Sequence, residues 1–253
     1  MELYKDKKWL EEQYLGLLRN GPDIAAEVGV GKTTIYGQLH RHNIAVRSCG
    51  EARHIAVKNE LLITKHLRDM LYGELLGDGN ISQQSKWSAY YQHSSKHREY
   101  LVWLSGEFAN QGLIQAGNIT QDYNNCWHYS TLNYAALLKV KDLFYPSGGR
   151  KTIPCDLMLN SMIARQWFIG DGSLCHSQHG RSSIKLATCA FEPQHIIGLI
   201  KQLTSCGIIA SYAKSNNSIH ISTSSARDFL EWIGPSPIEC YSYKWMLQDN
   251  TKQ

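Results

Sequence analysis

Apolar residues follow helical spacing in some segments of the chain and strand spacing in others, and the order of these segments occurs twice. Beyond residue 66, each copy opens with an apolar helical stretch that leads into a polar hairpin, a helix, further strands and a last helix. Each copy therefore predicts an αββαββα repeat, and the chain is predicted to be an α+β protein with two pseudo-symmetric repeats. In the first copy the expected elements after the opening helix are strands over 80–87 and 88–92, a helix over 100–114, a strand over 126–132 and a helix over 134–144. In the second they are a strand over 182–188, a helix over 193–206, strands over 212–215 and 219–223, and a helix over 225–233.

The first 50 residues carry a separate, all-helical pattern. Apolar residues recur at helical spacing from Trp9 to Leu18, and Asn20-Gly21-Pro22 then breaks the helix. A short helix over 23–28, a glycine turn and a third helix over 33–42 follow. This order of helix, turn and helix is that of a small helix-turn-helix domain.

The segment IAAEVGVGKTTIYGQLHRHNI closely resembles helix-turn-helix DNA-binding modules. The resemblance implies that the third helix turns Ile35 and Leu39 inward and exposes four polar residues to DNA, namely Lys32, Thr34, Gln38 and Arg41. A three-helix packing or oligomerisation domain is the alternative. A phosphate-binding loop at Gly31-Lys32-Thr33 is disfavoured, because Ala26 stands where that motif requires glycine and the preceding stretch is helical.

Each repeat begins with a version of one phrase, LYGELLGDGNIS at 71–82 and ARQWFIGDGSLC at 164–175. The acids of the two Gly-Asp-Gly sequences, Asp78 and Asp171, are 93 positions apart. An acid at the C-terminal end of a helix is unfavourable, because the helix dipole is already negative there. The same arrangement in both copies therefore suggests a compensating cation.

Small residues would allow the two opening helices to pack side by side. Gly73 and Gly77 are four positions apart and share one helix face, and Gly170 precedes the second acid. Close packing would bring the two carboxylates together beside helix-terminal carbonyls. Such an all-oxygen site suits Mg²⁺ or Ca²⁺.

These motifs and their spacing resemble those of the LAGLIDADG homing endonucleases, over roughly residues 60–250. Segments at 91–101, 143–146 and 150–154 add to the resemblance, whereas Glu74, Arg165 and Gln166 depart from the family pattern. The resemblance implies that Asp78 and Asp171 bind the metal ions with carbonyls of Gly77 and Gly170, and that both strands of DNA are cut. It also implies active-site lysines, for which Lys151 in RKTIP and Lys214 in the second half are the candidates. Mg²⁺ is the expected cofactor, and Ca²⁺ is expected to support binding without efficient cleavage.

The sheet faces that the helices leave open carry mixed hydrogen-bond donors and acceptors, which suit the reading of base edges in a major groove. An exposed antiparallel sheet with a wet face is the alternative explanation. The candidate DNA-contacting residues on the two sheets are Ser82, Gln84, Lys86, Gln92, Ser183, Lys185, Lys214 and His220.

Composition narrows these possibilities only slightly. The 253 residues are 43% hydrophobic, enough for an ordered core, and the net charge of +4 permits a polyanionic partner. No apolar run is long enough to span a membrane, and no signal-peptide pattern occurs. The seven cysteines lack a CxxC pair, and Cys175, His176 and His179 have no evident fourth zinc ligand. We therefore expect an intracellular protein with reduced thiols and no membrane association.

The predicted organisation is a helix-turn-helix domain over 1–50, a linker over 51–66, and repeats over 67–150 and 151–253. The leading hypothesis is a monomeric, site-specific DNA endonuclease that cuts a long double-stranded target. A non-cleaving DNA-binding regulator and an intron RNA maturase on the same fold are the alternatives. Loss of one or both acids would mark the regulator, and both acids are present.

Overall fold

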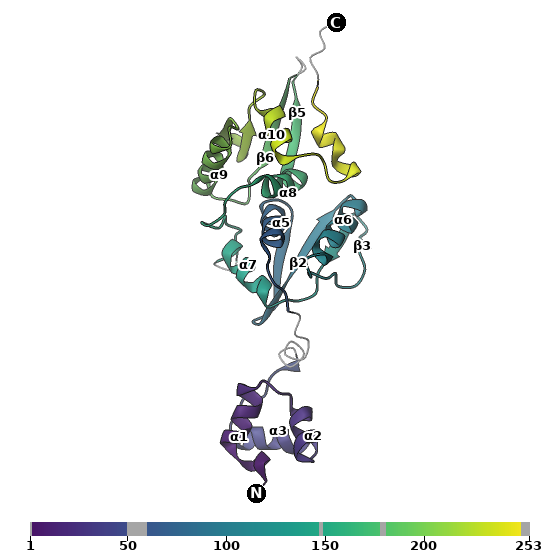
Figure 1. The fold of residues 1–253 in the computed structure, drawn as a ribbon, viewed down its shortest axis with the longest axis vertical. Helices are drawn as coiled ribbons and strands as arrows, with labels where there is room; N and C mark the ends of the chain where they lie inside the picture. The colour runs from purple at the N-terminus through teal and green to yellow at the C-terminus, as the bar shows by residue number, and fades with distance from the viewer. Residues whose placement is uncertain (1, 50–59, 147–148, 178–180, 249–253) are drawn as a thin grey trace. The chain divides into compact units, whose positions relative to one another are not determined.

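A computed structural model describes residues 2–49, 60–146, 149–177 and 181–248 (Figure 1). The chain forms two compact units, a smaller one of residues 1–59 with Ser85–Trp87 and a larger one of the remaining residues, and each has its own hydrophobic core. Within the described ranges, no helix is both long enough and apolar enough to cross a lipid bilayer. Much of the predicted linker over 51–66 lies outside these ranges, and its last two residues begin helix α5.

The smaller unit consists of short helices around seven buried apolar residues. Its elements are η1 (Leu3–Lys5), α1 (Lys7–Glu11), a π-helical turn η2 (Glu12–Gly16), α2 (Gly21–Val28) and α3 (Lys32–Arg41). The Asn20 side chain caps α2 by accepting a hydrogen bond from the Asp23 amide at 2.7 Å. Gly29 ends α2 in the left-handed conformation at φ 67°, which favours glycine. The core residues are Leu10, Tyr14, Ile24, Ala25, Ile35, Leu39 and Ile44.

Two details of this unit differ from the sequence-based expectation. Gln38 is buried, with 7% of its surface exposed, because it lies three positions after Ile35 and adjoins Leu39 on the inward face of α3. Leu17 and Leu18 are exposed, because the helical turn ends at Gly16 before it reaches them.

The larger unit has the predicted αββαββα order in both repeats. The first repeat comprises α5 (Lys65–Leu76), β1 (Asn80–Ser85), β2 (Ser88–Ser95), α6 (Arg98–Ala109), β3 (Thr120–Gln121), β4 (Trp127–Ser130) and α7 (Ala136–Phe144). The second comprises α8 (Ser161–Asp171), β5 (Gly172–His176), β6 (Ser182–Ala187), α9 (Pro193–Ser205), β7 (Ala210–Ala213), a 3-10 turn η3 (Lys214–Asn216), β8 (Ser218–Ile221) and α10 (Ala226–Ile233). Helix α6 ends before the predicted residue 114, since the chain turns at Gly112 with φ 82°.

Each repeat forms one four-stranded antiparallel sheet with equivalent connectivity. The strand order is β1-β2-β4-β3 in the first sheet and β5-β6-β8-β7 in the second. Burial alternates along the strands, and in β6 the side chains of Ile184 and Leu186 are buried whereas Ser183 and Lys185 are partly exposed. This alternation assigns one face of each sheet to the helices and the core.

Helices α5 and α8 lie side by side between the two sheets (Figure 1). They approach most closely at two pairs of equivalent positions, Gly73 opposite Gln166 and Gly77 opposite Gly170. A Cβ atom at Gly73 would lie 2.6 Å from Gln166 Cβ, and one at Gly77 would lie 3.4 Å from Gly170 Cα. The missing side chain of Gly73 thus accommodates Gln166, which departs from the family pattern.

A polar contact joins α5 to the start of α8. Asn160 caps α8 by accepting a hydrogen bond from the Ile163 amide, and its Nδ2 donates to Asp69 Oδ2 at 2.8 Å. Asp69 is buried and also accepts a hydrogen bond from Lys65 at 2.7 Å. The buried carboxylate is therefore paired, and it fixes the N-terminal end of α8 against α5.

The last element, the 3-10 helix η4 (Glu239–Trp245), was not predicted from the sequence. It follows α10 and lies against the first repeat, where the Tyr241 and Ser95 hydroxyl oxygens are 3.2 Å apart. Tyr241 also makes an edge contact with Tyr100 of α6. Helix η4 therefore connects the end of the second repeat to the first.

Candidate active site at the crossing of α5 and α8

The two acids of the repeated motif lie where the C-terminal ends of α5 and α8 meet. Asp171 is the last residue of α8, and Asp78 follows the end of α5 by two positions. Burial and the charge of Asp78 raise the pKa of Asp171 to about 6, and the positive charges of Lys151 and Lys244 oppose this rise. The charges of the two carboxylates therefore influence each other, as expected for acids at the ends of two packed helices.

Lys151 reaches the end of α5 from the loop before α8. Its Nζ donates hydrogen bonds to the carbonyl oxygens of Gly77 and Gly79, each at 3.0 Å. Burial lowers the pKa of Lys151, and the nearby Asp171 and Asp78 carboxylates oppose that effect. The lysine neutralises the negative end of the α5 dipole and places a cation beside the acids.

Lys244 of η4 makes the equivalent contacts at the end of α8. Its Nζ donates to the carbonyl oxygens of Ile169 at 2.6 Å and Phe168 at 3.2 Å, with Gly170 O at 3.4 Å. Burial lowers the pKa of Lys244 to about 8, again against the effect of the two acids. Lys244 follows Lys151 by 93 positions, the spacing that also separates the two acids.

The structure places Lys214, the sequence-based candidate for the second half, elsewhere. Lys214 is exposed in η3, the turn between β7 and β8. Among the described residues, Lys244 and not Lys214 donates to the carbonyls that end α8. The 93-residue spacing applied to Lys151 would have identified Lys244 from the sequence.

Glu74 places a third acid inside the same region. It is 2% exposed, and its carboxylate accepts hydrogen bonds from the hydroxyls of Tyr91, at 2.6 Å, and Tyr100. His93 Nδ1 lies 2.9 Å from Glu74 Oε2. These partners come from β2 and α6, and their hydrogen bonds compensate the burial of the Glu74 carboxylate. In the sequence Glu74 was visible only as a departure from the family pattern. The equivalent residue in the second repeat is Trp167, so the network belongs to one half only.

Residues 68–229 match the LAGLIDADG DNA endonuclease family. The chain belongs to this family. The uncharacterized protein MJ1098 of Methanocaldococcus jannaschii is 27% identical over 194 residues, which cover 71% of this chain and 70% of that protein. DNA endonuclease I-ChuI of Chlamydomonas applanata is 24% identical over 209 residues, which cover 72% and 95% of the two chains.

The fold is shared with a solved structure of the homing endonuclease I-WcaI bound to its DNA recognition sequence. The TM-score is 0.64 at 18% sequence identity, and the match covers 81% of this chain and 96% of that one. The comparison confirms the two-repeat architecture predicted from the LAGLIDADG motifs. Family membership supports a DNA endonuclease with DNA as its partner.

The end of the LAGLIDADG helices has the chemistry of a site for a hard divalent cation. Asp78 and Asp171 supply carboxylates, and a bound cation would oppose both the burial and the charge of Asp78 that raise the pKa of Asp171. The carbonyls of Gly77 and Gly170 accept hydrogen bonds from the lysines. A carbonyl oxygen has two lone pairs, so these contacts leave each one able to bind a metal.

The predicted DNA-contacting residues of the first sheet lie on or next to β1 and β2. Gln92 Nε2 donates to Ser82 Oγ at 3.0 Å, and Gln84 Oε1 accepts from Asn133. Lys86 lies at the hairpin turn, with its Nζ 4.7 Å from the ring centroid of Trp87.

In the second sheet, strand register aligns the candidates in a row. Lys185 is paired with His220 across β6 and β8, and Ser173 and Ser211 extend this row onto β5 and β7. Ser183 lies opposite Cys175. The row carries hydroxyl, ammonium and imidazole groups at positions that alternate with the core residues, although Nε2 of His220 is itself buried.

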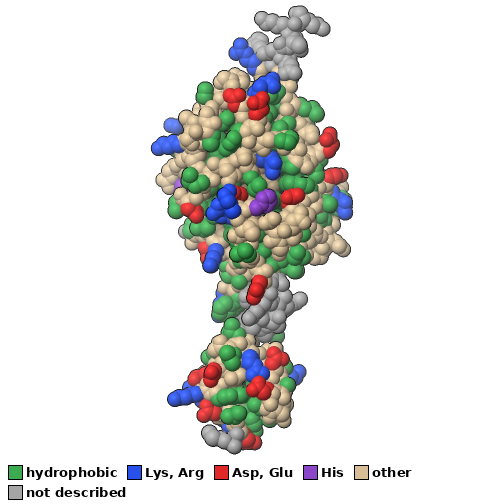
Figure 2. All heavy atoms as spheres, viewed as in Figure 1, with side chains coloured by type: hydrophobic (Ala, Val, Ile, Leu, Met, Phe, Trp, Pro, Cys, Tyr) green, Lys and Arg blue, Asp and Glu red, His purple; other side chains and the backbone are tan. Residues whose placement is uncertain are grey.

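The face in Figure 2 shows Lys and Arg side chains interspersed with Asp and Glu. The basic side chains on this face therefore do not form one continuous patch that would indicate where DNA binds. In the smaller unit, Lys32, Thr34 and Arg41 are exposed on α3 as expected.

Proposed function

We propose that this protein is a site-specific, double-strand DNA endonuclease of the homing type, with Mg²⁺ held by Asp78 and Asp171. The observation that carries the proposal is the repetition of one Asp–Lys arrangement at the crossing of α5 and α8. Asp78 with Lys151, and Asp171 with Lys244, lie at equivalent helix ends. Two equivalent half-sites suit two scissile phosphates, one on each strand.

The residues divide the chemical work between them. Asp78 and Asp171 would hold a divalent ion, which when bound would supply an activated water and neutralise charge on the leaving oxygen. Lys151 and Lys244 hold ammonium groups at the helix ends, where they stabilise negative charge that develops on a phosphate. The carbonyls of Gly77 and Gly170 complete an oxygen-rich ligand set.

DNA recognition is assigned to the open faces of the two sheets. The row of Ser173, Lys185, His220 and Ser211 offers donors and acceptors suited to base edges. Exposed Lys32, Thr34 and Arg41 of α3 would add contacts from the smaller unit. The names of I-ChuI and I-WcaI, a DNA endonuclease and a homing endonuclease bound to its recognition sequence, support this function. Because one chain carries both half-sites, a monomer is sufficient.

The test is cleavage of a DNA target library in Mg²⁺. Asp78→Asn and Asp171→Asn should each abolish double-strand cleavage and retain DNA binding in Ca²⁺, whose looser coordination does not align water well. Asp142→Asn, which removes an exposed acid from α7, is the matched control and should cut normally.

Near-normal cutting by either motif variant would contradict the metal assignment. Binding of a selected target by the wild type without any cleavage would contradict the endonuclease and identify a regulator instead.

A further inference from the structure

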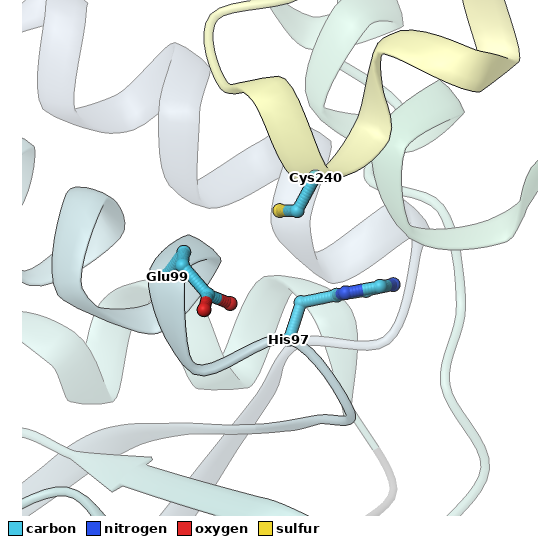
Figure 3. Close-up of side chains that lie close together, drawn as sticks. All are labelled: His97, Glu99 and Cys240. Carbon is cyan, nitrogen blue, oxygen red and sulfur yellow. The ribbon is translucent and has the colours of Figure 1, made fainter.

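A second group of metal-binding side chains lies where η4 meets α6. His97 immediately precedes α6, Glu99 lies in its first turn, and Cys240 belongs to η4. One ligand atom from each residue lies within 4.8 Å of those of the other two. In Figure 3 the Cys240 sulfur and the Glu99 carboxylate lie on the same side of His97, and the His97 ring is directed away from them, so it must turn to face an ion between the three. Residues more than 140 positions apart are thus brought to one point.

The protein itself holds the backbones of these residues in place. The His97 amide donates to Ser95 Oγ at 3.1 Å, and that hydroxyl oxygen is 3.2 Å from the Tyr241 hydroxyl. The rings of His97 and Tyr241 make an edge contact with centroids 4.9 Å apart. The start of α6 and helix η4 are therefore packed against each other, and this packing brings the three metal-binding side chains close together.

The ligand set differs chemically from the acid pair. Thiolate and imidazole ligands favour zinc, whereas carboxylate and carbonyl oxygens favour magnesium or calcium. A tetrahedral zinc ion with bonds of about 2.0–2.3 Å holds its ligand atoms roughly 3.3–3.8 Å apart. Atoms no more than 4.8 Å apart reach that spacing with shifts of about 1–1.5 Å, and the Glu99 side chain is exposed.

We propose that His97, Glu99 and Cys240 bind one Zn²⁺ ion that fastens η4 to α6, with water as the fourth ligand. The carboxylate and the thiolate together balance the charge of the ion, and Cys240 gives its proton to solvent on binding. The site joins the C-terminal end of the second repeat to the first repeat.

Zinc at this position would also order the segment that carries Lys244. Cys240 precedes Lys244 by four residues within the same 3-10 helix. Any effect of this ordering on DNA cleavage rests on the proposed nuclease function. Binding of zinc is independent of it and can be measured without DNA.

The test uses Co²⁺ as a spectroscopic probe on the metal-free, full-length protein. Titration should produce a near-ultraviolet thiolate-to-cobalt absorption band that saturates at one equivalent, and Zn²⁺ should displace it. Cys240→Ser should lose the band, whereas Cys206→Ser, which alters an exposed cysteine, should retain it. Glu99→Gln should weaken Zn²⁺ binding at least about tenfold, since even outer-shell changes cost 10–100-fold.

Thermal unfolding gives a second readout. Zn²⁺ at a hundredfold excess over its Kd should raise the Tm by about 5–10 °C. Asp171→Asn should keep this shift, because the acid pair is a different site, and Cys240→Ser should lose it. A missing cobalt band in the wild type, or an unchanged band in Cys240→Ser, would overturn the zinc site. Neither result bears on whether the acid pair cuts DNA.

Discussion

Among single residues, Lys244 shows how burial and charge compete in the site. Its side chain is 6% exposed, and burial lowers its pKa to about 8, well below that of a lysine in an unfolded chain. Charged Lys244 therefore costs folding free energy below pH 8, and this cost disappears as the pH rises toward about 10.5. A buried ammonium group beside two acids is typical of a functional site, where an arriving anion makes use of its charge.

Replacement of Lys244 by methionine should slow the chemical step. The loss of one charge near a phosphate should lower the single-turnover rate at saturating enzyme on the order of 10²-fold, mainly for one strand. Nicked DNA should therefore accumulate. Lys214→Met removes an exposed lysine in the β7–β8 turn and serves as the control.

The comparison of these two variants distinguishes the two candidates for the second half. We expect Lys214→Met to change DNA affinity more than the rate of the chemical step. A normal rate for Lys244→Met together with a slow rate for Lys214→Met would restore the candidate chosen from the sequence.

Among the elements, the crossing of α5 and α8 sets the geometry of the site. Gly73→Ala should destabilise it, because the new Cβ would lie 2.6 Å from both Gln166 Cβ and the Ile163 carbonyl oxygen. Overpacking of this kind costs about 1–3 kcal/mol, and a loss of that size lowers the Tm by several degrees. The Tm from thermal unfolding and the cleavage rate should both decrease.

Gly106→Ala in α6 is the matched control for this substitution. A Cβ there meets nothing within 4 Å, and the exchange of a helical glycine for alanine should stabilise the protein by about 0.5–1 kcal/mol. Equal effects of the two substitutions on the Tm would contradict the close helix contact at Gly73.

Elements with strong periodicity were predictable from the sequence, and those positioned by distant contacts were not. The alternation around Ile184 predicted β6, and the repeated Gly-Asp-Gly predicted the ends of α5 and α8. Helix η4 has no such pattern, because its place depends on contacts of Tyr241 and Lys244 with residues far away in the sequence.

The hydrogen-bond partners of buried polar groups could not be predicted from the sequence either. Glu74 is stable in the core only because Tyr91, His93 and Tyr100 surround it in three dimensions. The resemblance to helix-turn-helix modules implied an exposed Gln38, but its position between Ile35 and Leu39 turns it inward. The sequence therefore predicted three of the four exposed residues of α3 but neither the burial of Gln38 nor the partners of Glu74.

For the whole molecule, the two separate cores predict that the smaller unit can be removed. A fragment that starts at residue 60 should fold, because it retains the core shared by both repeats. It should cut the same central sequence and bind DNA more weakly. Each lost phosphate contact should lower the log-log salt slope by about 0.9.

Footprinting provides the control for this deletion. The protected region should shrink on one flank only, because the smaller unit occurs once and the nuclease core has two halves. A fragment with the affinity and footprint of the full chain would identify residues 1–49 as a packing domain.

The pairing of Gly73 with Gln166 has a consequence for assembly. These residues occupy equivalent places in the two repeats, 93 positions apart, yet one has no side chain and the other fills the space that this leaves. Two copies of the first repeat would face each other across a void, and two copies of the second would bring two glutamines into room for one. The helix crossing thus favours packing of the first repeat against the second over packing of two identical repeats. It therefore disfavours the pairing of like repeats from neighbouring chains during folding.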